Sequence, residues 1–504
     1  MYALEDITIA QAFKRTVNKA PGKLALEFRD KKVSWEEFDT VSDHFSYYFS
    51  IIGIKEGTHV AIWNFPCLEF FYAYIGLMKL GAVAIPVNIH YKQRELADAL
   101  EKVDAEYLLC CKERKDMALE VFTGAVCFDE IIINNKLRKT AKTANPDVND
   151  TANILFTSGT TSGIKGAMLT HFNIFNNGAI IAEKLRINAD DKLCLCVPMF
   201  HCFGVTVGFM VSIVTGCSLY VIDDFSTINV LEAVDKHKCT ILNGVPTMFL
   251  SMLHKKELDE FDLSSLKTGI IAGSPVSQKE YLEICRKLDI NLFMSYGLTE
   301  TSPCVSISGY DDSLEEKSDN VGFVTEHVEV KIADINTGES LGKGQNGEIL
   351  VKGYNVMQGY YHLKAETEKI FDSGYLRTGD LGYIDDNNRL HIIGRIKEII
   401  IRGGEKISPS EIENCIKECE NILKVKVVGV ESAVLHEEIA ACIITKDGSE
   451  ACAETIKEYL AQKLAYYKIP KYVFTFKEFP LSEVGKVKLN EIKKIANDLK
   501  NRNK

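Results

Sequence analysis

The sequence predicts an α/β protein with a large amino-terminal domain, a β-rich subdomain and a small, mobile α+β carboxy-terminal domain. Helical and strand-like patterns alternate over the first 300 residues, which is typical of parallel α/β layers. From about residue 320 short strand-like pieces separated by turns take over, and after Arg395 an α+β pattern of domain length follows. We therefore expect domains at 1–396 and 397–504, with the β-rich part at about 320–396.

Capping signals and apolar runs place the individual elements. Ser34 and Glu37 have the spacing of a capping box, which predicts a helix that continues to about Ile52. Further helices are expected at 68–80, 409–418 and 455–464. Strands are expected at 59–63, from 83, and at 107–110, 154–156, 241–243, 269–272, 292–295, 425–430, 439–444 and 473–476.

Composition indicates a globular chain with more than one folding unit. Its 504 residues exceed one ordinary hydrophobic core, and 46% hydrophobic with 26% charged residues is typical of globular proteins. The net charge of -11 argues against a nucleic-acid partner, because a phosphate backbone requires a broad basic surface. A small polyphosphate ligand requires only a few local cations.

The 15 cysteines favour reduced core thiols over disulfides, because they are scattered and several stand in apolar runs. Cys415 and Cys419 lack a second pair at zinc spacing, so no zinc site is expected there. The amino terminus has no apolar run of signal-peptide length, which makes a cytoplasmic location the expectation.

One uncharged stretch, 193–222, is long enough to span a bilayer. Pro198, His201 and several glycines interrupt it, and its two ends are strand-like. These interruptions favour a buried strand-helix-strand unit over a membrane span, so no transmembrane segment is expected.

The stretch "ILFTSGTTSGIKGAML", residues 154–169, has the composition of a loop that holds phosphate groups. An apolar strand leads into small residues with exposed amides and hydroxyls, and a lysine follows. The spacing of Gly159 and Lys165 is not that of a Walker A motif, and a plain surface turn is the alternative. The candidate phosphate-binding residues are Thr157, Ser158, Gly159, Thr160, Thr161 and Lys165.

Three later motifs fit a nucleotide ligand. In "SYGLTETSP", residues 295–303, an aromatic ring suits stacking on a base and Glu300 suits a magnesium ion. The long motif that starts with "YLRTGDLGY" at 375 supplies Asp380, which can accept hydrogen bonds from ribose hydroxyls. "PLSEVGKVKLN", from 480 to 490, puts Lys486 on a glycine-flanked turn.

Together and in this order, the four motifs resemble those of the adenylate-forming superfamily, which contains acyl-CoA synthetases, peptide-synthetase adenylation domains and luciferases. The resemblance covers essentially the whole chain and is closest to fatty-acid or aryl-acid CoA ligases. It implies that ATP and Mg²⁺ activate a carboxylate as an acyl-adenylate with release of pyrophosphate. The acyl group then passes to a thiol, for which CoA is the expected acceptor.

The resemblance also implies roles for single residues. Residues 157–165 would hold the β- and γ-phosphates of ATP, although Ser162 and Ile164 stand where glycine and proline are usual. The other implied roles are adenine contact for Gly273, Ser274 and Pro275, adenine stacking for Tyr296, phosphate contact for Thr299, magnesium binding for Glu300, and ribose binding for Asp380 and Arg395.

For the two half-reactions, the resemblance implies an exchange of groups by domain rotation. Lys486 would reach the reacting carboxylate and phosphate during adenylation, although Leu489 stands where a supporting arginine is usual. Lys397 occupies the hinge position. The loop that moves in for the thiol step contains Gly403, Gly404 and Lys406.

The acid pocket is expected around "VPMFHCFGVTVGFM", residues 197–210. Amino-acid-activating members place an aspartate here, and 200–207 contain none, so an apolar acid is favoured. Phe200, His201 and Val205 are the pocket candidates, His201 with a catalytic role, and Gly297 would leave room for a long acid. Two alternatives remain open: a ligase that loads an acyl carrier protein, and a non-catalytic acyl-nucleotide binding protein.

The hinge assignment gives the first prediction. Lys397→Pro fixes one backbone torsion at the hinge and removes an N–H, so it is expected to impair thioester formation more than adenylation. Pyrophosphate release and acyl-CoA formation, measured separately, check this. Equal loss of both half-reactions would count against the hinge assignment.

Overall fold

The computed structural model describes residues 2–133, 141, 143–159, 163–222, 225–402, 405–432, 435–464, 466–481 and 487–502. At 132, 133, 158, 159, 163, 401, 405, 406 and 436 it describes the backbone alone. The first of two compact units consists of Met1–Val330, Leu350–Arg377 and Asn388–Leu390, and the second of Lys331–Ile349, Thr378–Asn387 and His391–Lys504. The domain boundary expected between 396 and 397 stays a prediction.

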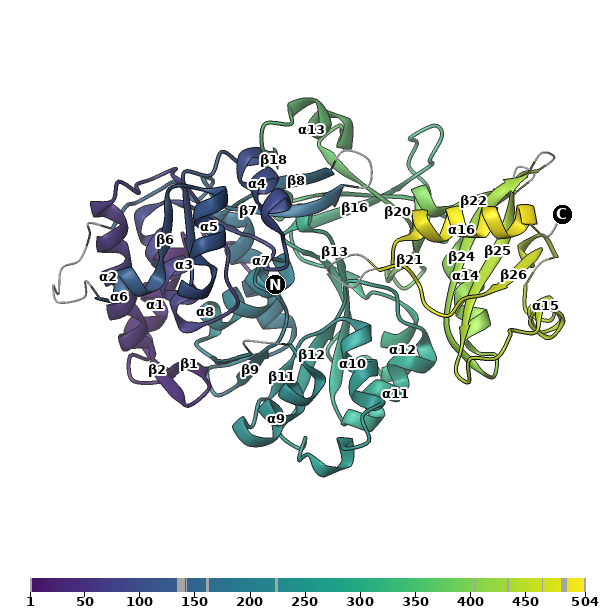
Figure 1. The fold of residues 1–504 in the computed structure, drawn as a ribbon, viewed down its shortest axis with the longest axis horizontal. Helices are drawn as coiled ribbons and strands as arrows, with labels where there is room; N and C mark the ends of the chain where they lie inside the picture. Colours follow the sequence, from purple (N-terminus) through teal and green to yellow (C-terminus); the bar gives the residue numbers. More distant parts are fainter. Residues whose placement is uncertain are drawn as a thin grey trace. The chain divides into compact units, whose positions relative to one another are not determined.

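One sheet of the first unit carries the phosphate-loop sequence, and its strand order is β18-β8-β7-β4-β3-β5-β6. Figure 1 labels β18, β8, β7 and β6 of this sheet. Strand β7 runs parallel to β4, while β8 is antiparallel to both β7 and β18. The strands are β3 His59–Ile62, β4 Val83–Pro86, β5 Tyr107–Cys110, β6 Ala125–Cys127, β7 Thr151–Gly159, β8 Gly163–Thr170 and β18 Gly359–Tyr360.

A second sheet of the same unit has the order β15-β14-β13-β12-β11-β9-β10-β1-β2. The strands from β13 to β1 in this order are parallel, and β14, β15 and β2 are antiparallel to their neighbours. The strands are β1 Leu24–Phe28, β2 Lys31–Ser34, β9 Lys192–Leu195, β10 Ser218–Val221, β11 Ile241–Leu242, β12 Thr268–Ile271, β13 Asn291–Gly297, β14 Cys304–Ile307 and β15 Phe323–Val324. The carboxyl ends of the parallel strands share one edge, which is where open α/β sheets bind ligands.

Helices between the strands bury apolar faces against these sheets. The predicted capping box is confirmed, since the Glu37 amide donates to Ser34 Oγ at 3.2 Å and the Ser34 amide donates to Glu37 Oε2 at 2.8 Å. Helix α3 is almost entirely buried. The helices are α1 Ile9–Lys19, α2 Trp35–Ile51, α3 Leu68–Leu80, α4 Gln93–Lys102, α5 Lys115–Val121, α6 Phe128–Ile133, α7 His171–Lys184, α8 Val211–Thr215, α9 Thr227–His237, α10 Pro246–Leu253, α11 Gln278–Leu288, α12 Leu314–Asp319 and α13 Lys364–Ile370.

The uncharged stretch 193–222 forms the predicted strand-helix-strand unit. Strand β9 leads into a π-helix, Phe203–Met210, which continues as α8 before β10. Within the described part of the chain, no helix has the length and apolar character that a membrane crossing requires.

The β-rich part and the carboxy-terminal region confirm the predicted fold class. One sheet has the order β16-β17-β20-β19, with β21 beside β20, and a mixed sheet has the order β23-β22-β25-β24, with β26 beside β25. The elements are β16 Val328–Ala333, β17 Gly347–Gly353, β19 Phe371–Asp372, β20 Tyr375–Ile384, β21 Leu390–Arg395, β22 Ile400–Arg402, β23 Glu405–Ile407, α14 Pro409–Lys417, β24 Ile422–Ser432, β25 His436–Thr445, α15 Ala453–Ala461, β26 Tyr472–Thr475 and α16 Leu489–Arg502.

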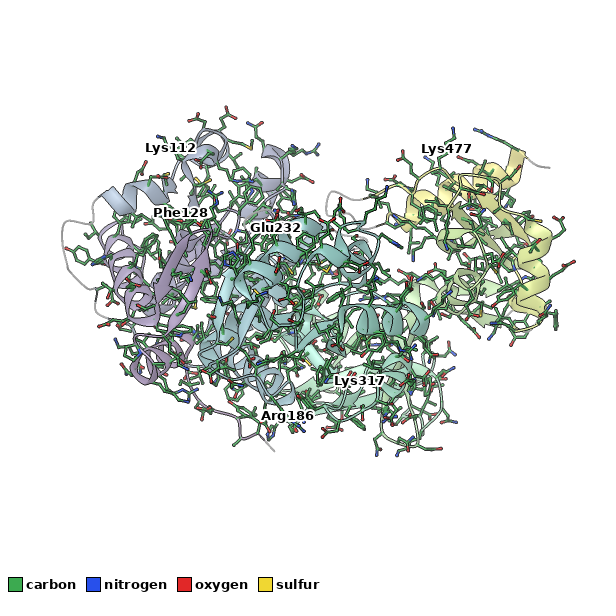
Figure 2. All side chains as sticks on the ribbon, turned by 90° about the horizontal axis from the view of Figure 1, so that it is seen from below. Lys112, Phe128, Arg186, Glu232, Lys317 and Lys477 are labelled. Carbon is green, nitrogen blue, oxygen red and sulfur yellow. The ribbon has the colours of Figure 1, made fainter. Side chains whose placement is uncertain are left out.

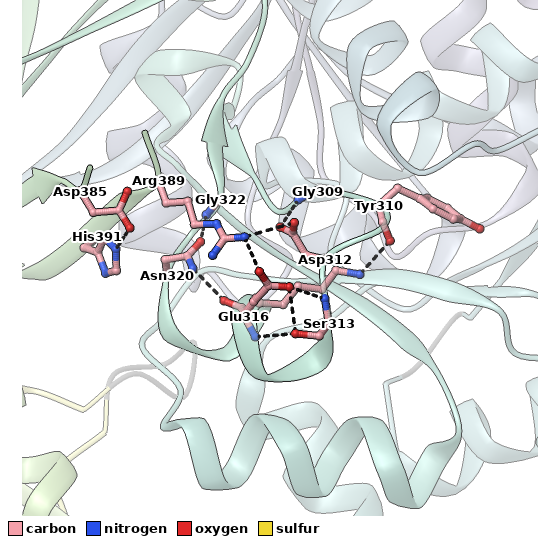
Figure 3. A network of polar contacts seen from close by, with 11 residues as sticks. Gly309, Tyr310, Asp312, Ser313, Glu316, Asn320, Gly322, Asp385, Arg389 and His391 are labelled. Carbon is pink, nitrogen blue, oxygen red and sulfur yellow. Dashed lines mark hydrogen bonds and ion pairs between the residues drawn. The ribbon is translucent and has the colours of Figure 1, made fainter. Parts of the chain in front are cut away.

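A polar network fixes residues 388–390 within the first unit. The Arg389 guanidinium contacts Asp312 at 3.4 Å and Glu316 at 2.9 Å (Figure 3). Nearby in sequence, the buried Lys317, labelled in Figure 2, donates to Asn291 Oδ1 at 2.6 Å and to the Tyr310 carbonyl at 3.2 Å. Since Arg389 and Ser313 donate to the Glu316 carboxyl, its pKa falls to about 2.

This depressed pKa gives a pH-dependent prediction. The unfolded chain binds a proton at Glu316 near pH 4.5, so the Arg389 contact stabilises the fold above that pH and loses this effect as pH falls toward 2. Arg389→Met is therefore expected to lower the melting temperature at about pH 6 and to have a smaller effect at about pH 3. Thermal melts across this range check it.

Arg286→Met is the matched control, because Arg286 pairs with Glu315 at 2.8 Å while both side chains are mostly exposed. Its effect on the melting temperature should be small at either pH. An Arg389→Met effect that does not shrink on acidification would contradict the role given to Glu316.

Candidate active site

The described part of the phosphate-loop sequence lies in the paired antiparallel strands β7 and β8. The strand expected at 154–156 continues to Gly159, and Thr157 lies directly opposite Lys165. Of the predicted loop residues, Thr160 and Thr161 lie outside the described residues, and Ser158 and Gly159 are described by their backbone alone.

Lys165 is held from two sides. Its Nζ lies 3.0 Å from Glu366 Oε2 and 4.9 Å from the centre of the Tyr360 ring. Both partners come from the segment that adds β18 to the edge of β8, with Tyr360 paired to Ala167, and that continues into α13 (Figure 1). The Lys165 side chain is 13% exposed.

The same segment holds Glu300. This residue lies in a 3₁₀ turn, Thr299–Thr301, directly after β13. Tyr360 Oη donates to Glu300 Oε1 at 2.7 Å, and the Met357 amide donates to the Glu300 carbonyl at 2.9 Å. The Glu300 side chain is half-buried. Its carboxylate oxygens therefore fit the prediction of a magnesium ligand, because Mg²⁺ prefers such oxygens.

The predicted adenine contacts follow two neighbouring parallel strands. Gly273, Ser274 and Pro275 form an exposed segment after β12, and Tyr296 lies half-buried near the end of β13. Since β12 and β13 are paired and parallel, both groups lie at the same edge of the sheet. Gly273 has φ +88°, a conformation that glycine adopts without strain.

The predicted acid-pocket residues lie before and inside the π-helix. The rings of Phe200 and His201 are 4.6 Å apart, and Val205 is fully buried in the core. Cys202 joins this segment to the nucleotide motif, because its thiol lies 3.6 Å from Thr299 Oγ1. Burial raises the pKa of the Cys202 thiol to about 11, so it stays protonated near neutral pH.

Gly297 has a structural reason to be glycine. A Cβ at this position would lie 1.6 Å from the Pro303 carbonyl oxygen, because Gly297 and the residues around Pro303 pair across a tight turn. The Leu298 amide also donates to the Pro303 carbonyl at 3.2 Å. The predicted role of Gly297 in the pocket floor stays a prediction.

In the second unit, Asp380 and Arg395 form the predicted pair. Arg395 Nε lies 2.6 Å from Asp380 Oδ1, and the Asp380 side chain is 5% exposed. Lys397 lies in a 3₁₀ turn, Ile396–Glu398. Gly403, Gly404 and Lys486 lie outside the described residues, and Lys406 is described by its backbone alone.

Sequence reasoning missed Tyr360, Glu366 and Cys202 as parts of this site. Tyr360 and Glu366 lie about 200 residues after Lys165, and only the pairing of β18 with β8 brings them together. The signal for Cys202 was present, because it follows the Phe200-His201 pair directly.

Comparisons with known proteins agree with this geometry. The family model described as AMP-binding enzyme matches residues 13–361, and the model of its C-terminal domain matches 411–486. The candidate acyl-CoA synthetase YngI of Bacillus subtilis is 34% identical over 97% of this chain and 96% of its own. The mitochondrial medium-chain acyl-CoA ligase ACSF2 of Danio rerio is 31% identical over 98% of this chain and 89% of its own.

Among solved structures, the o-succinylbenzoate CoA synthetase MenE of Bacillus subtilis, in complex with ATP and magnesium, superimposes with a TM-score of 0.85. It is 27% identical and covers 96% of this chain and 99% of its own.

The backbone around Gly297 gives a prediction for the site. Gly297→Ala is expected to displace the turn that carries Thr299 and Glu300, because the new Cβ cannot approach Pro303 so closely. Turnover should fall at least about tenfold, as expected when catalytic groups shift by about an ångström, and equally for short and long acids. Initial rates with a series of acids check this.

Gly22→Ala is the control, since a Cβ there meets nothing within 4 Å. Loss of turnover with long acids alone would instead favour the pocket-floor role of Gly297.

Proposed function

The chain belongs to the AMP-binding enzyme family, and from this premise we propose that it converts an apolar, fatty carboxylic acid to its CoA thioester. The activity is that of an AMP-forming acyl-CoA synthetase, which uses ATP, Mg²⁺ and CoA. The finer assignment of the acid, and of a role to each residue, is the proposal.

The observation that carries the proposal is the convergence of Lys165 and Glu300 on Tyr360. A cation for phosphates and a carboxylate for magnesium must both face the polyphosphate of one ATP molecule. We assign Lys165 and residues 157–161 to the β- and γ-phosphates, Glu300 to Mg²⁺, and Thr299 to the phosphate of the adenylate. Pyrophosphate would leave along the hairpin formed by β7 and β8.

The other assignments follow the order of the reaction. Tyr296 and residues 273–275 would bind adenine, while Asp380 and Arg395 would bind the ribose. Lys486 would meet the negative charge that develops when the carboxylate attacks the α-phosphate, a type of contact worth about 100- to 1000-fold in rate. The loop with Gly403, Gly404 and Lys406 would serve thiol transfer, and Lys397 would act as the hinge.

Three observations favour a fatty acid. Residues 200–207 contain no carboxylate that could pair with an ammonium group. Phe200 and Val207 are buried apolar side chains of this segment. The relative ACSF2 is named a medium-chain acyl-CoA ligase. MenE, in contrast, is named for an aryl acid, so benzoates and o-succinylbenzoate belong in the test.

The test is pyrophosphate release with ATP and Mg²⁺ across acids from acetate to palmitate, benzoates, o-succinylbenzoate and amino acids, each with and without CoA. We expect the highest turnover with medium-chain fatty acids, and only when CoA is present, because a thiol must release the adenylate. Glu300→Gln is the control, with turnover at least about 100-fold lower for every acid.

A preference for benzoates or o-succinylbenzoate would overturn the fatty-acid assignment while leaving the ligase activity intact. An adenylate that forms but persists with CoA would identify an acyl carrier protein as the acceptor. Tight ATP binding with no pyrophosphate release from any acid would favour a non-catalytic acyl-nucleotide binding protein.

A further inference from the structure

Tyr360 contacts both charged groups that the ATP polyphosphate requires. Its hydroxyl donates to Glu300 Oε1 at 2.7 Å, and the face of its ring lies 4.9 Å from Lys165 Nζ. Glu366, six residues further along the chain, accepts from Lys165 Nζ at 3.0 Å. We propose that Tyr360 and Glu366 are positioning residues, which fix the Glu300 carboxylate and the Lys165 ammonium group for Mg²⁺ and the phosphates of ATP.

The first argument concerns the direction of the Lys165 ammonium group. A lysine ammonium has three N–H donors on a flexible stem, so it binds a phosphate well only if the stem is held. Glu366 takes one donor, and the negative face of the Tyr360 ring attracts the same charge from another direction. These two contacts hold the ammonium end of the stem.

The second argument concerns the Glu300 carboxylate. Tyr360 Oη donates to Glu300 Oε1 at 2.7 Å, and the Met357 amide, three residues earlier on the same segment, donates to the Glu300 carbonyl at 2.9 Å. This segment therefore holds both the side chain and the backbone of Glu300.

The third argument is that the strand does not need the hydroxyl. Tyr360 joins the sheet through its backbone, opposite Ala167, and Tyr361 continues this contact by donating its amide to the Gly166 carbonyl at 2.9 Å. Phenylalanine would preserve both the pairing and the ring beneath Lys165. The role left for the hydroxyl is to orient the Glu300 carboxylate, to which it donates at 2.7 Å.

The test measures binding of the α,β-methylene analogue of ATP by calorimetry, with Mg²⁺ and with EDTA. This analogue cannot release pyrophosphate, so the measurement needs neither an acid nor turnover. For Tyr360→Phe we expect Kd to rise about tenfold with Mg²⁺, the effect of one hydrogen bond to a charged group, and by a smaller factor in EDTA, where only the contact of the hydroxyl with the Thr157 side chain is lost. Tyr360→Leu should weaken binding under both conditions, because it also removes the ring beneath Lys165.

Glu366 is tested in the same way. Glu366→Ala should raise Kd several-fold both with Mg²⁺ and in EDTA, because the position of Lys165 matters for the phosphates themselves. Glu366→Gln keeps an acceptor for Lys165 and should restore most of the affinity. Glu368→Ala is the matched control, since Glu368 lies on the same helix, is mostly exposed and pairs with the exposed Lys364 at 3.9 Å.

The outcomes separate this proposal from the assignment of the acid. A Tyr360→Phe variant with unchanged Kd in Mg²⁺, or with equal losses in Mg²⁺ and EDTA, would overturn the role of the hydroxyl. Failure of Glu366→Gln to restore binding, with an unchanged melting temperature, would overturn the role of Glu366. The acid panel plays no part in either result, so the fatty-acid assignment can fail independently.

Discussion

The hydrogen bond from Tyr360 to Glu300 joins two regions that come from different sheets of the first unit. Glu300 follows β13, whereas Tyr360 belongs to β18 at the edge of the sheet that carries the phosphate-loop hairpin. Because Tyr360 also lies under Lys165, one aromatic side chain sets the spacing between a carboxylate and an ammonium group. A ligand that bears phosphates and a divalent cation requires such spacing, and neither sheet provides it alone.

Much of the fold could be predicted because its signals are local. The capping box at Ser34, the buried run of α3 and the interruptions within 193–222 each lie inside a short window, where periodicity and turn chemistry are informative. The site residues taken from the motifs stay predictions, and the structure brings two of them, Lys165 and Glu300, into contact with Tyr360. Their neighbours Tyr360, Glu366 and Cys202 were missed, because those contacts depend on which strands pair and on how the chain before the π-helix meets Thr299.

The glycine at position 297 can be explained in two ways, by the size of the acid pocket or by the packing of the backbone. From the sequence, Gly297 suggests room for a long acid, whereas the structure supplies a carbonyl oxygen that excludes any side chain there. The turn from Gly297 to Pro303 is closed by two hydrogen bonds of the Thr301 hydroxyl. Thr301 Oγ1 accepts from the Leu298 amide at 2.9 Å and donates to the Pro303 carbonyl at 2.7 Å. This closure holds Thr299 and Glu300 at a fixed height above the sheet edge, so conformational precision is sufficient reason for glycine.

The hinge proposal can be tested against the ionic contacts of the residues that precede Lys397. Arg389 is fixed by Asp312 and Glu316, and Arg395 is fixed by the buried Asp380. In the proposed assignment Asp380 and Arg395 bind the ribose, and such a pair must stay with the nucleotide through both half-reactions, because the adenylate made in the first is consumed in the second. A pivot before Arg395 would have to break its 2.6 Å contact with Asp380 or carry both residues away from the nucleotide. A pivot at Lys397 requires neither, since the 3₁₀ turn at 396–398 follows the pair directly. Retention of the ribose pair therefore favours Lys397 over any earlier position as the hinge.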